Sequence, residues 1–381
     1  MGLGQLYISL ETSVLCEDWI YRGNILKNSI FANMKRLAFY LAVLLAAICC
    51  DKPEKILFVG TYTDGFHIFD YRTGEQLDKA PMPNPSFLAI NGDIIYAVSE
   101  MPNEMARVFA WEWGGDGLDL INSQPTGLPE YGEDPCHVVT DGEILAVSNY
   151  SGGTLALYTL GADGSISPMD SLIVSRTGGP DLSRQDLPHV HCAAFTPDGK
   201  QLLFSEFSAD AIGQVTVSRF GASDLKTAAQ LPPDFGPRHI LFDKSGKYFY
   251  VIGELSGDIA VFDWDGASLT LKQVVKADQV DARGAADIHF SPDGQFLYAS
   301  LRLQNDGIAI FSVNDDGTLT PAGYQLTGAH PRNFCVTDDE VLVACRDTDC
   351  IEFYTRDKKT GLLTDTGRRL NVSKPVFIAV Q

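Results

Sequence analysis

The chain has 381 residues, of which 45% are hydrophobic and 10% aromatic, which excludes a disordered or fibrous protein and leaves material for a large core. Its net charge of −20 and pI near 4.6 argue against a nucleic-acid partner, because that role needs a basic surface. With 35 glycines and 19 prolines, the composition favours many short strands joined by turns.

The N-terminal segment has the pattern of a targeting signal. From Met34 the sequence passes through two basic residues into the apolar stretch 37–48, an order typical of a secretory signal. The apolar stretch is too short to span a bilayer as a helix. We therefore expect residues 34–50 to be a signal peptide, residues 1–33 to be an upstream extension outside the fold, and Met34 to be the true start.

The two cysteines at the end of this signal leave two interpretations open. A small-residue run that ends in cysteine is typical of bacterial lipoprotein signals, which predicts membrane attachment through a lipidated Cys49 or Cys50. Ile48 is bulky where a small residue is usual, so an ordinary signal peptide or membrane anchor is the alternative. Both interpretations predict an exported, periplasmic or membrane-attached protein, and without a signal the protein would be cytoplasmic.

The rest of the chain carries an internal repeat, in which a short strand beginning near a proline or polar residue recurs about every 50 residues. The seven copies are 85–89, 135–139, 190–195, 237–242, 286–290, 331–336 and 375–379. Each of the first six is followed by a turn and a second apolar strand. Turns such as 291–294 (SPDG) place glycine where a left-handed conformation is needed.

The repeat count closes only as a ring. The chain ends at Gln381 before a seventh second strand, and an unpaired apolar strand, 56–62, precedes the first copy. Pairing of these two terminal strands leaves no free sheet edge. We predict an all-β, seven-bladed β-propeller with four antiparallel strands per blade, formed by residues 55–381 as one domain. Stacked repeats also form open solenoids, which the shared terminal blade disfavours.

In a propeller, the start of each first strand and the end of each second strand lie at one mouth of the central channel. Aligned on the turn glycines, the first position reads Ser86, Cys136, His191, Arg238, Ala286, Arg332 and Val376. The second position reads Glu100, Tyr150, Phe207, Glu254, Arg302 and Arg346. A purely structural position repeats similar residues, so the departures to arginine, histidine and glutamate indicate a site grafted on the scaffold.

Four of these residues come from three consecutive blades, and we take them as catalytic candidates: His191, Arg238, Glu254 and Arg302. Two guanidiniums can bind a carboxylate or phosphate and stabilise an oxyanion, while glutamate and histidine can exchange protons with water. Arg332, Arg346 and Glu100 are candidates for substrate binding. The alternative is an internal arginine–glutamate network that braces the channel, with His191 as a core residue.

Several short motifs are spread over about residues 55–381: 60–63 (GTYT), 135–137 (PCH), 149–150 (NY), 236–239 (GPRH), 254–255 (EL) and the turn 291–294 (SPDG). They resemble those of the propeller lactonase family, which includes bacterial 6-phosphogluconolactonases and fungal carboxymuconate lactonizing enzymes. The resemblance implies the same active-site set, His191, Arg238, Glu254 and Arg302. Its motifs add His137 and Asn149 as substrate-binding candidates, and it implies no metal and no cofactor.

The resemblance implies hydrolysis of a sugar lactone, with 6-phosphogluconolactone as the leading substrate and either Glu254 or His191 as the base. Gly253 and Leu301 stand where members often have asparagine, so the substrate is less constrained than the fold. Export also conflicts with a phosphorylated cytosolic substrate. The alternatives are a lyase that closes or opens a lactone on an unsaturated diacid, and a non-catalytic exported propeller that binds a sugar acid or a protein. A closed ring needs no partner to fold, so we expect a monomer.

Overall fold

The computed structural model describes residues 55–115, 117–129 and 131–381. The predicted signal peptide, the upstream extension, Cys49 and Cys50 lie outside the described residues. Within the described part, the chain forms 28 strands and three short 3₁₀ helices, η1 (Asn103–Met105), η2 (Phe207–Ala209) and η3 (Arg346–Thr348). No helix in these ranges is long and apolar enough to cross a membrane. The five cysteines in these ranges are unpaired, and all but Cys335 are buried.

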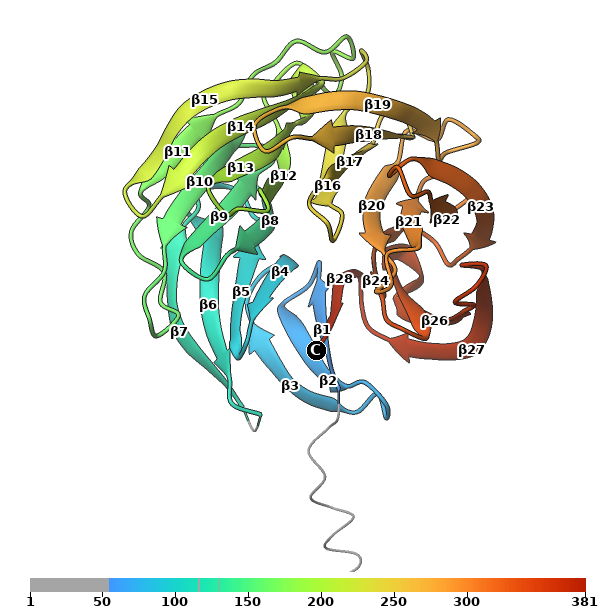
Figure 1. The fold of residues 1–381 in the computed structure, drawn as a ribbon. Coiled ribbons are helices and arrows are strands. Elements are labelled where there is room, and N and C mark those ends of the chain that lie inside the picture. Colours follow the sequence, from blue (N-terminus) through green and yellow to red (C-terminus); the bar gives the residue numbers. More distant parts are fainter. Residues whose placement is uncertain (1–54, 116, 130) are drawn as a thin grey trace, which may run out of the picture. The chain divides into compact units, whose positions relative to one another are not determined.

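The described strands form seven four-stranded antiparallel sheets, each of which is one blade (Figure 1). Blade 1 contains β1 (Ile56–Thr61), β2 (Gly65–Asp70), β3 (Gln76–Pro81) and, from the end of the chain, β28 (Pro375–Val380). Blade 2 contains β4 (Pro85–Asn91), β5 (Ile94–Ser99), β6 (Arg107–Trp113) and β7 (Leu118–Pro125). Blade 3 contains β8 (Pro135–Thr140), β9 (Ile144–Asn149), β10 (Thr154–Thr159) and β11 (Ser171–Val174).

The remaining four blades follow in the same order along the chain. Blade 4 contains β12 (Val190–Phe195), β13 (Gln201–Glu206), β14 (Ala211–Ser218) and β15 (Gly221–Gln230). Blade 5 contains β16 (Pro237–Phe242), β17 (Tyr248–Gly253), β18 (Asp258–Trp264) and β19 (Leu269–Lys276). Blade 6 contains β20 (Ala285–Phe290), β21 (Phe296–Leu301), β22 (Gly307–Val313) and β23 (Leu319–Leu326). Blade 7 contains β24 (Pro331–Val336), β25 (Glu340–Cys345), β26 (Cys350–Arg356) and β27 (Leu363–Asn371).

The ring is closed by β28, which lies beside β1 (Figure 1). Phe58 pairs with Ala379 and Val59 with Ile378, and Ile56 and Gln381 exchange backbone hydrogen bonds of 2.8 and 3.0 Å. Neighbouring inner strands contact one another around the whole ring, including β28 with β4. The predicted seven-bladed propeller with a shared terminal blade is therefore confirmed, and the open solenoid is excluded.

The hydrophobic core lies between neighbouring blades. Among the described residues there are seven buried clusters, one for each pair of adjacent blades. In one of them, Tyr250 and Ile259 of blade 5 pack against Leu297 and Phe311 of blade 6. Each blade buries apolar side chains on both faces, so no blade forms a complete core alone. This packing holds the inner strands in place around the channel.

A β-bulge near the start of each inner strand shapes the channel. In blade 5, Pro237 pairs with Gly253 and Ile240 with Val251, so the two residues between them on β16 stand opposite one residue on β17. The same irregularity occurs in β12 and β20. A bulge turns side chains that would otherwise alternate between the faces of the sheet. Consecutive residues, rather than alternate ones, can thus face the channel.

Candidate active site at the channel mouth

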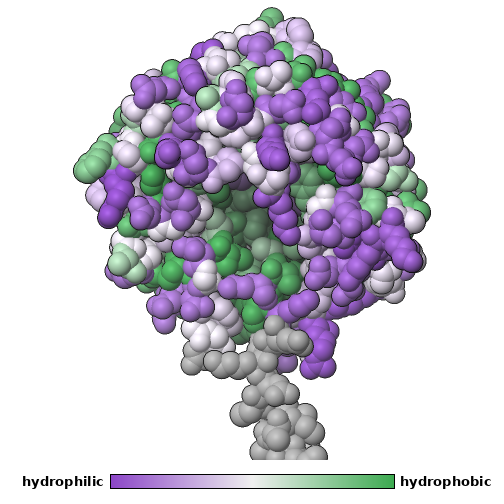
Figure 2. Space-filling view, viewed as in Figure 1, coloured by the Kyte–Doolittle hydropathy of each residue, from purple (hydrophilic) through white to green (hydrophobic). Residues whose placement is uncertain are grey.

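The second residue of each inner strand contributes to a first ring around the channel. Six of the seven positions aligned from the sequence line one small cavity: Ser86, Cys136, His191, Arg238, Arg332 and Val376. Phe87, His239 and Asn333, each one residue further along its strand, line the same cavity. The centre of the ring is hollowed in the space-filling view, within a largely hydrophilic surface (Figure 2). The alignment on turn glycines thus placed the first ring correctly.

Three guanidiniums surround the carboxylate of Glu254, which follows the last residue of β17. Arg238 Nε lies 2.9 Å and Arg302 Nη2 lies 3.2 Å from Glu254 Oε2. Both distances are those of ion pairs, although the Arg238 Nε–H bond does not point at the carboxylate oxygen closely enough to form a hydrogen bond. The Nε of Arg302 donates a hydrogen bond of 2.8 Å to the Gly284 carbonyl. Three of the four predicted catalytic residues therefore meet at one point.

Burial and mutual charge set the ionisation of this cluster. Burial raises the pKa of Glu254, but Arg302, Arg238 and Arg184 outweigh it and lower the pKa to about 2. Burial and the neighbouring arginines lower the pKa of Arg302 to about 9, although Glu254 opposes them. At neutral pH the cluster therefore holds an ionised carboxylate and charged guanidiniums. The excess of positive charge attracts an anion.

The third guanidinium, Arg184, was not found from the sequence. It lies in the loop 175–189 between β11 and β12, and its Nη2 donates a hydrogen bond of 2.7 Å to Glu254 Oε1. This loop lies outside the repeat, so Arg184 has no equivalent in the other blades and no alignment of the copies reveals it. Among the described residues, it makes the hydrogen bond that holds Glu254 in place.

The loop 175–189 is fixed at several points. Arg176 Nε donates to Glu206 Oε1 at 3.0 Å, and Asp181 is ion-paired with Arg283. The Gln185 amide is 1% exposed and donates to the Phe207 carbonyl at 3.0 Å and to Asp210 at 2.8 Å. Because both sides of Arg184 are anchored, its guanidinium is preorganised over the channel mouth.

His191 completes the predicted catalytic set and lies in the same cavity as Arg238. It is 4% exposed, and its Nδ1 has no hydrogen-bond partner among the described residues. Burial lowers the pKa of His191 well below its usual value, and Arg238 lowers it further. The imidazole is therefore neutral at physiological pH. Among the described residues, no hydrogen bond to Nδ1 fixes which ring nitrogen of His191 carries the proton.

A second charged group lies across the channel from this cluster. Arg332 Nη2 lies 3.8 Å from Glu100 Oε1, and the same oxygen accepts a hydrogen bond of 2.8 Å from the Tyr62 hydroxyl. The Arg332 guanidinium also sits 5.0 Å from the centre of the Tyr62 ring. Arg332 and Glu100 are thus placed together at the mouth, as their positions in the repeat predicted.

The other predicted substrate-binding residues are placed less favourably. Arg346 turns to Asp347, with Nε 2.7 Å from Oδ1. Asn149 is fully buried and donates to the Thr126 carbonyl at 2.7 Å and to Thr154 at 2.9 Å. The Asn149 side chain thus forms hydrogen bonds within the fold, and its role in substrate binding stays a prediction.

His137 belongs to a second ring, below the first, formed by the third residues of the inner strands. These residues are Phe87, His137, Cys192, His239, Asp287, Asn333 and Phe377. Neighbours touch around the ring: His137 Nε2 lies 3.3 Å from Cys192 Sγ, and the Phe87 ring centre lies 4.4 Å from that of His137 and 4.7 Å from that of Phe377. The side chains of the second ring thus pack against one another beneath the first.

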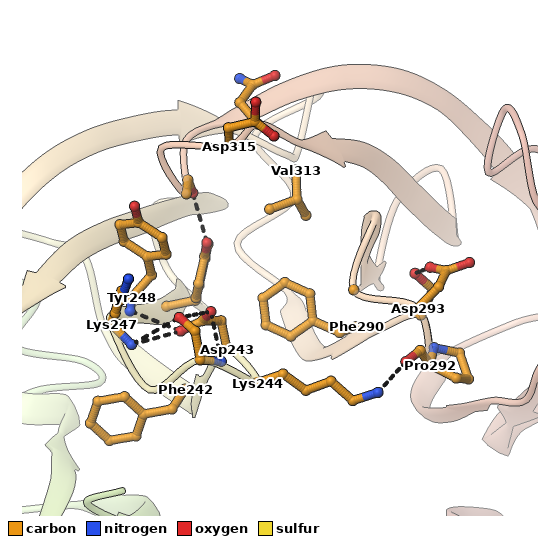
Figure 3. Close-up of a pocket in the computed structure, with 16 residues that line it drawn as sticks. Phe242, Asp243, Lys244, Lys247, Tyr248, Phe290, Pro292, Asp293, Val313 and Asp315 are labelled. Carbon is orange, nitrogen blue, oxygen red and sulfur yellow. Dashed lines mark hydrogen bonds between the residues drawn. The ribbon is translucent and has the colours of Figure 1, made fainter.

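A larger pocket, of about 590 Å³, lies at the opposite ends of the strands, between blades 5 and 6 (Figure 3). Several of its polar groups are bonded within or between the turns that line it: Asp243 Oδ1 accepts from the backbone of Lys247 at 3.0 Å and of Tyr248 at 2.9 Å, and Lys244 donates to the Pro292 carbonyl. These groups already have partners within the turns. The channel mouth, with its unpaired polar atoms, is therefore the better candidate site.

Known proteins of one family match this chain over nearly all of the propeller. A family model described as "Lactonase, 7-bladed beta-propeller" matches residues 56–380. A 6-phosphogluconolactonase of Formosa agariphila is 34% identical over 83% of this chain and 97% of the relative. A solved structure from Bacteroides uniformis, provisionally named a 6-phosphogluconolactonase, is 41% identical with a TM-score of 0.81, over 86% of this chain and all of that one.

A third similar protein is the periplasmic gluconolactonase PpgL of Pseudomonas aeruginosa. Its structure is 26% identical with a TM-score of 0.77, over 86% of this chain and 98% of that one. The family model spans the whole propeller, from β1 to β28, and the relatives are matched over nearly their full length. The chain therefore belongs to the lactonase family of seven-bladed β-propellers.

Proposed function

We propose that the chain hydrolyses a sugar lactone that carries an anionic group, with 6-phosphogluconolactone as the first candidate. The observation that carries this proposal is the pair of buried guanidiniums, Arg238 and Arg302, that face one carboxylate at the channel mouth. Family membership and the names of the relatives support a lactone as the substrate. The excess positive charge of the cluster supports an anionic one.

Arg238 and Arg302 would hold the carbonyl oxygen of the lactone and stabilise the negative charge that develops on it. Water adds to the carbonyl carbon, the ring C–O bond breaks, and the ring oxygen receives a proton to give the open hydroxy acid. Donors that are already in place in a dry site contribute about 2.7 to 4 kcal/mol each to such a step. Glu254 would keep the two guanidiniums aligned.

Glu254 is poorly suited to be the base. Its pKa of about 2 leaves it ionised but a weak proton acceptor at neutral pH, because three arginines stabilise the carboxylate. His191, the other candidate, is neutral and lines the same cavity. The proton from water would therefore go to an imidazole rather than to Glu254.

A second substrate, unphosphorylated gluconolactone, is favoured if the chain is exported. The similar protein PpgL is named a periplasmic gluconolactonase, so an exported member of this fold that acts on gluconolactone has a precedent. We propose export for this chain on the signal pattern of residues 34–50. Mass spectrometry of membrane and soluble fractions would show whether Cys49 or Cys50 carries lipid.

The test is hydrolysis of freshly prepared 6-phosphogluconolactone and of gluconolactone by the full-length protein, with spontaneous ring opening subtracted. Arg302→Ala should abolish turnover, whereas Arg72→Ala, at an exposed position just beyond the end of β2, is the matched control for loss of an arginine. Turnover of the phosphorylated lactone alone supports the first substrate, and turnover of gluconolactone supports the second. No turnover of either would sink the hydrolase proposal and leave a lyase or a binding protein.

A further inference from the structure

The bulge in β16 brings His239 to the centre of the channel beside the proposed site. His239 follows Arg238, and both lie in the bulge, so both side chains face the channel. The His239 ring centre lies 5.3 Å from that of His191, 5.8 Å from that of His137 and 5.7 Å from that of Phe87. The imidazole is 7% exposed. It is thus a central member of the second ring and also lines the cavity under the first.

Asp287 fixes the orientation of this imidazole. Its Oδ1 is hydrogen-bonded to His239 Nδ1, and its Oδ2 accepts from Asn333 and lies 2.9 Å from His289 Nε2. Asp287 is 2% exposed, so its charge is held away from water. An ionised carboxylate can only accept, so His239 Nδ1 carries the proton in this bond. Nε2 of His239 is then left as an acceptor.

The charge of Asp287 is balanced on the far side, by His289. Burial raises the pKa of Asp287, but His289 and His239 lower it overall, well below the usual value. Burial lowers the pKa of His289, but Asp287 outweighs this and raises it. Burial also lowers the pKa of His239, and there Asp287 does not compensate. At neutral pH this gives an ionised Asp287 and a neutral His239, while His289 keeps its proton to a higher pH than a free imidazole does.

The cavity between the two rings has the size and polarity of a water site. Its volume is about 10 Å³, about what one water needs. Two polar atoms of its lining residues, Ser86 Oγ and His191 Nδ1, are buried and have no hydrogen-bond partner among the described residues. Buried polar atoms are usually paired, so these atoms point to a bound water. That water would lie in the cavity that Arg238 and His239 also line.

We propose that His239 is the base that takes the proton from the attacking water, and that Asp287 positions it. This inference rests on the proposed lactone hydrolysis. The water oxygen bonds to the carbonyl carbon while its proton moves to His239 Nε2. The ring C–O bond then breaks, and the proton passes from His239 to the released ring oxygen. A base held in one tautomer by a buried carboxylate is the arrangement that such proton transfer requires.

The main test compares His239→Gln with wild-type protein on whichever lactone the wild-type enzyme hydrolyses. Loss of a general base lowers kcat by about 10²- to 10⁴-fold. We expect that loss with KM little changed, because His239 lies beneath the guanidiniums that bind substrate. Asp287→Asn should lower kcat by about 10²-fold or more, because the tautomer is no longer fixed. A His239→Gln enzyme within about threefold of wild type in kcat would overturn the proposal.

The pH profile separates a catalytic role for His239 from a structural one. The wild-type kcat/KM should fall as the pH drops below the lowered pKa of His239. The charged and titratable groups that face His239 are His137, His191, Arg238, Asp287 and His289. His289→Gln removes the cation that balances Asp287, so it should move the acid limb to higher pH while turnover persists at pH 8. An acid limb unmoved in His289→Gln would contradict the charge arrangement.

A measurement on the unaltered protein covers the case in which the buried variants do not fold. Nitrogen NMR of ¹⁵N-histidine-labelled wild type distinguishes a proton on Nδ1 from one on Nε2. We expect His239 to carry it on Nδ1 alone at pH 7, and an Nε2-protonated or doubly protonated ring would overturn the proposal. Failure of wild-type protein on every lactone would instead sink the proposed function. The two failures are therefore distinguishable.

Discussion

Arg184 Nη2 donates a hydrogen bond of 2.7 Å to Glu254 Oε1, although Arg184 lies in the loop before blade 4 and Glu254 directly follows strand β17 of blade 5. The Arg184 side chain is 36% exposed, whereas the side chains of Arg238 and Arg302 are 2% and 5% exposed. An anion that enters the mouth therefore meets Arg184 before it meets the buried pair. This places Arg184 where it can select for substrate charge.

We predict that Arg184→Ala lowers kcat/KM for a phosphorylated or carboxylated lactone by about 10- to 100-fold, the value of one hydrogen bond to a charged group. Most of the change should appear in KM, because Arg184 binds the anionic group rather than the reacting carbonyl. An uncharged lactone should be affected much less. Steady-state kinetics on a charged and an uncharged lactone, measured side by side, check this prediction.

Arg176→Ala is the matched control for the Arg184 variant. Arg176 lies in the same loop, but its guanidinium is paired with Glu206 rather than with Glu254. Because Arg176 anchors the loop without contacting Glu254, its removal should raise KM for the charged lactone much less than Arg184→Ala does. If both variants raised KM equally, the effect would come from the position of the loop, and the assigned role of Arg184 would be wrong.

We predict that Glu254→Gln destabilises the fold by about 3 to 5 kcal/mol, because it leaves three guanidiniums, two of them buried, without their counter-charge. Urea denaturation at pH 7 measures this change. Asp64→Asn, which removes an exposed partner of Lys79, should change stability by less than about 1 kcal/mol. Equal effects of the two substitutions would contradict the account.

The sign of the pH dependence follows from the lowered pKa of Glu254. A carboxyl whose folded-state pKa lies below its unfolded value stabilises the fold above that unfolded value. The contribution of Glu254 should therefore be complete above about pH 4.5 and disappear as the pH falls towards 2. The difference in stability between wild type and Glu254→Gln should shrink over that range. A constant difference would show that Glu254 is not held ionised by its neighbours.

The fold could be predicted from the sequence because the repeat is regular. The inner strands β12, β16 and β24 begin and end at the residues that the repeat predicts. Gly199, Gly246 and Gly294 have positive φ angles of 70°, 69° and 72°, as the turn sequences require. The unpaired strands at the two ends of the chain fixed the closure of the ring. Local pattern and overall topology agree here, so each supports the other.

The site was only half predictable, for two physical reasons. A regular strand alternates its side chains, so Arg238 in the channel would imply that His239 points away from it. The bulge in β16 overrides this alternation and creates the second ring, which a sequence alignment does not reveal. Arg184 is brought in by contacts of a loop outside the repeat. Both departures from the regular pattern occur at the site.

We predict that deletion of residues 375–381 abolishes cooperative folding. Without β28, strand β1 loses its inner neighbour, and the ring opens between β24 and β4. An open edge of unpaired backbone groups promotes association between molecules. Thermal denaturation and light scattering should show a broad transition and soluble aggregates. Ile378→Val is the control, since it keeps β28 and should cost only about 0.5 to 1.5 kcal/mol. A sharp, monomeric transition in the deletion variant would contradict closure by β28.

His289 gives the last prediction, which concerns stability rather than turnover. Its folded-state pKa is raised, because Asp287 outweighs burial. A histidine of this kind stabilises the fold fully below its unfolded pKa, about 6.5, and the contribution is lost as the pH rises through the folded-state value. The difference in unfolding free energy between wild type and His289→Gln should therefore be largest near pH 6 and shrink towards pH 9.

Urea titrations from pH 5.5 to 9 measure this difference, and His67→Gln provides a contrast. Burial lowers the pKa of His67, so the neutral form is favoured in the folded state and wild-type stability relative to His67→Gln should rise with pH. The two differences should thus run in opposite directions. A difference for His289→Gln that rises with pH, like that of His67, would mean that His289 is neutral. Asp287 would then rely on His239 for its counter-charge, and His239 could no longer serve as a neutral base at pH 7.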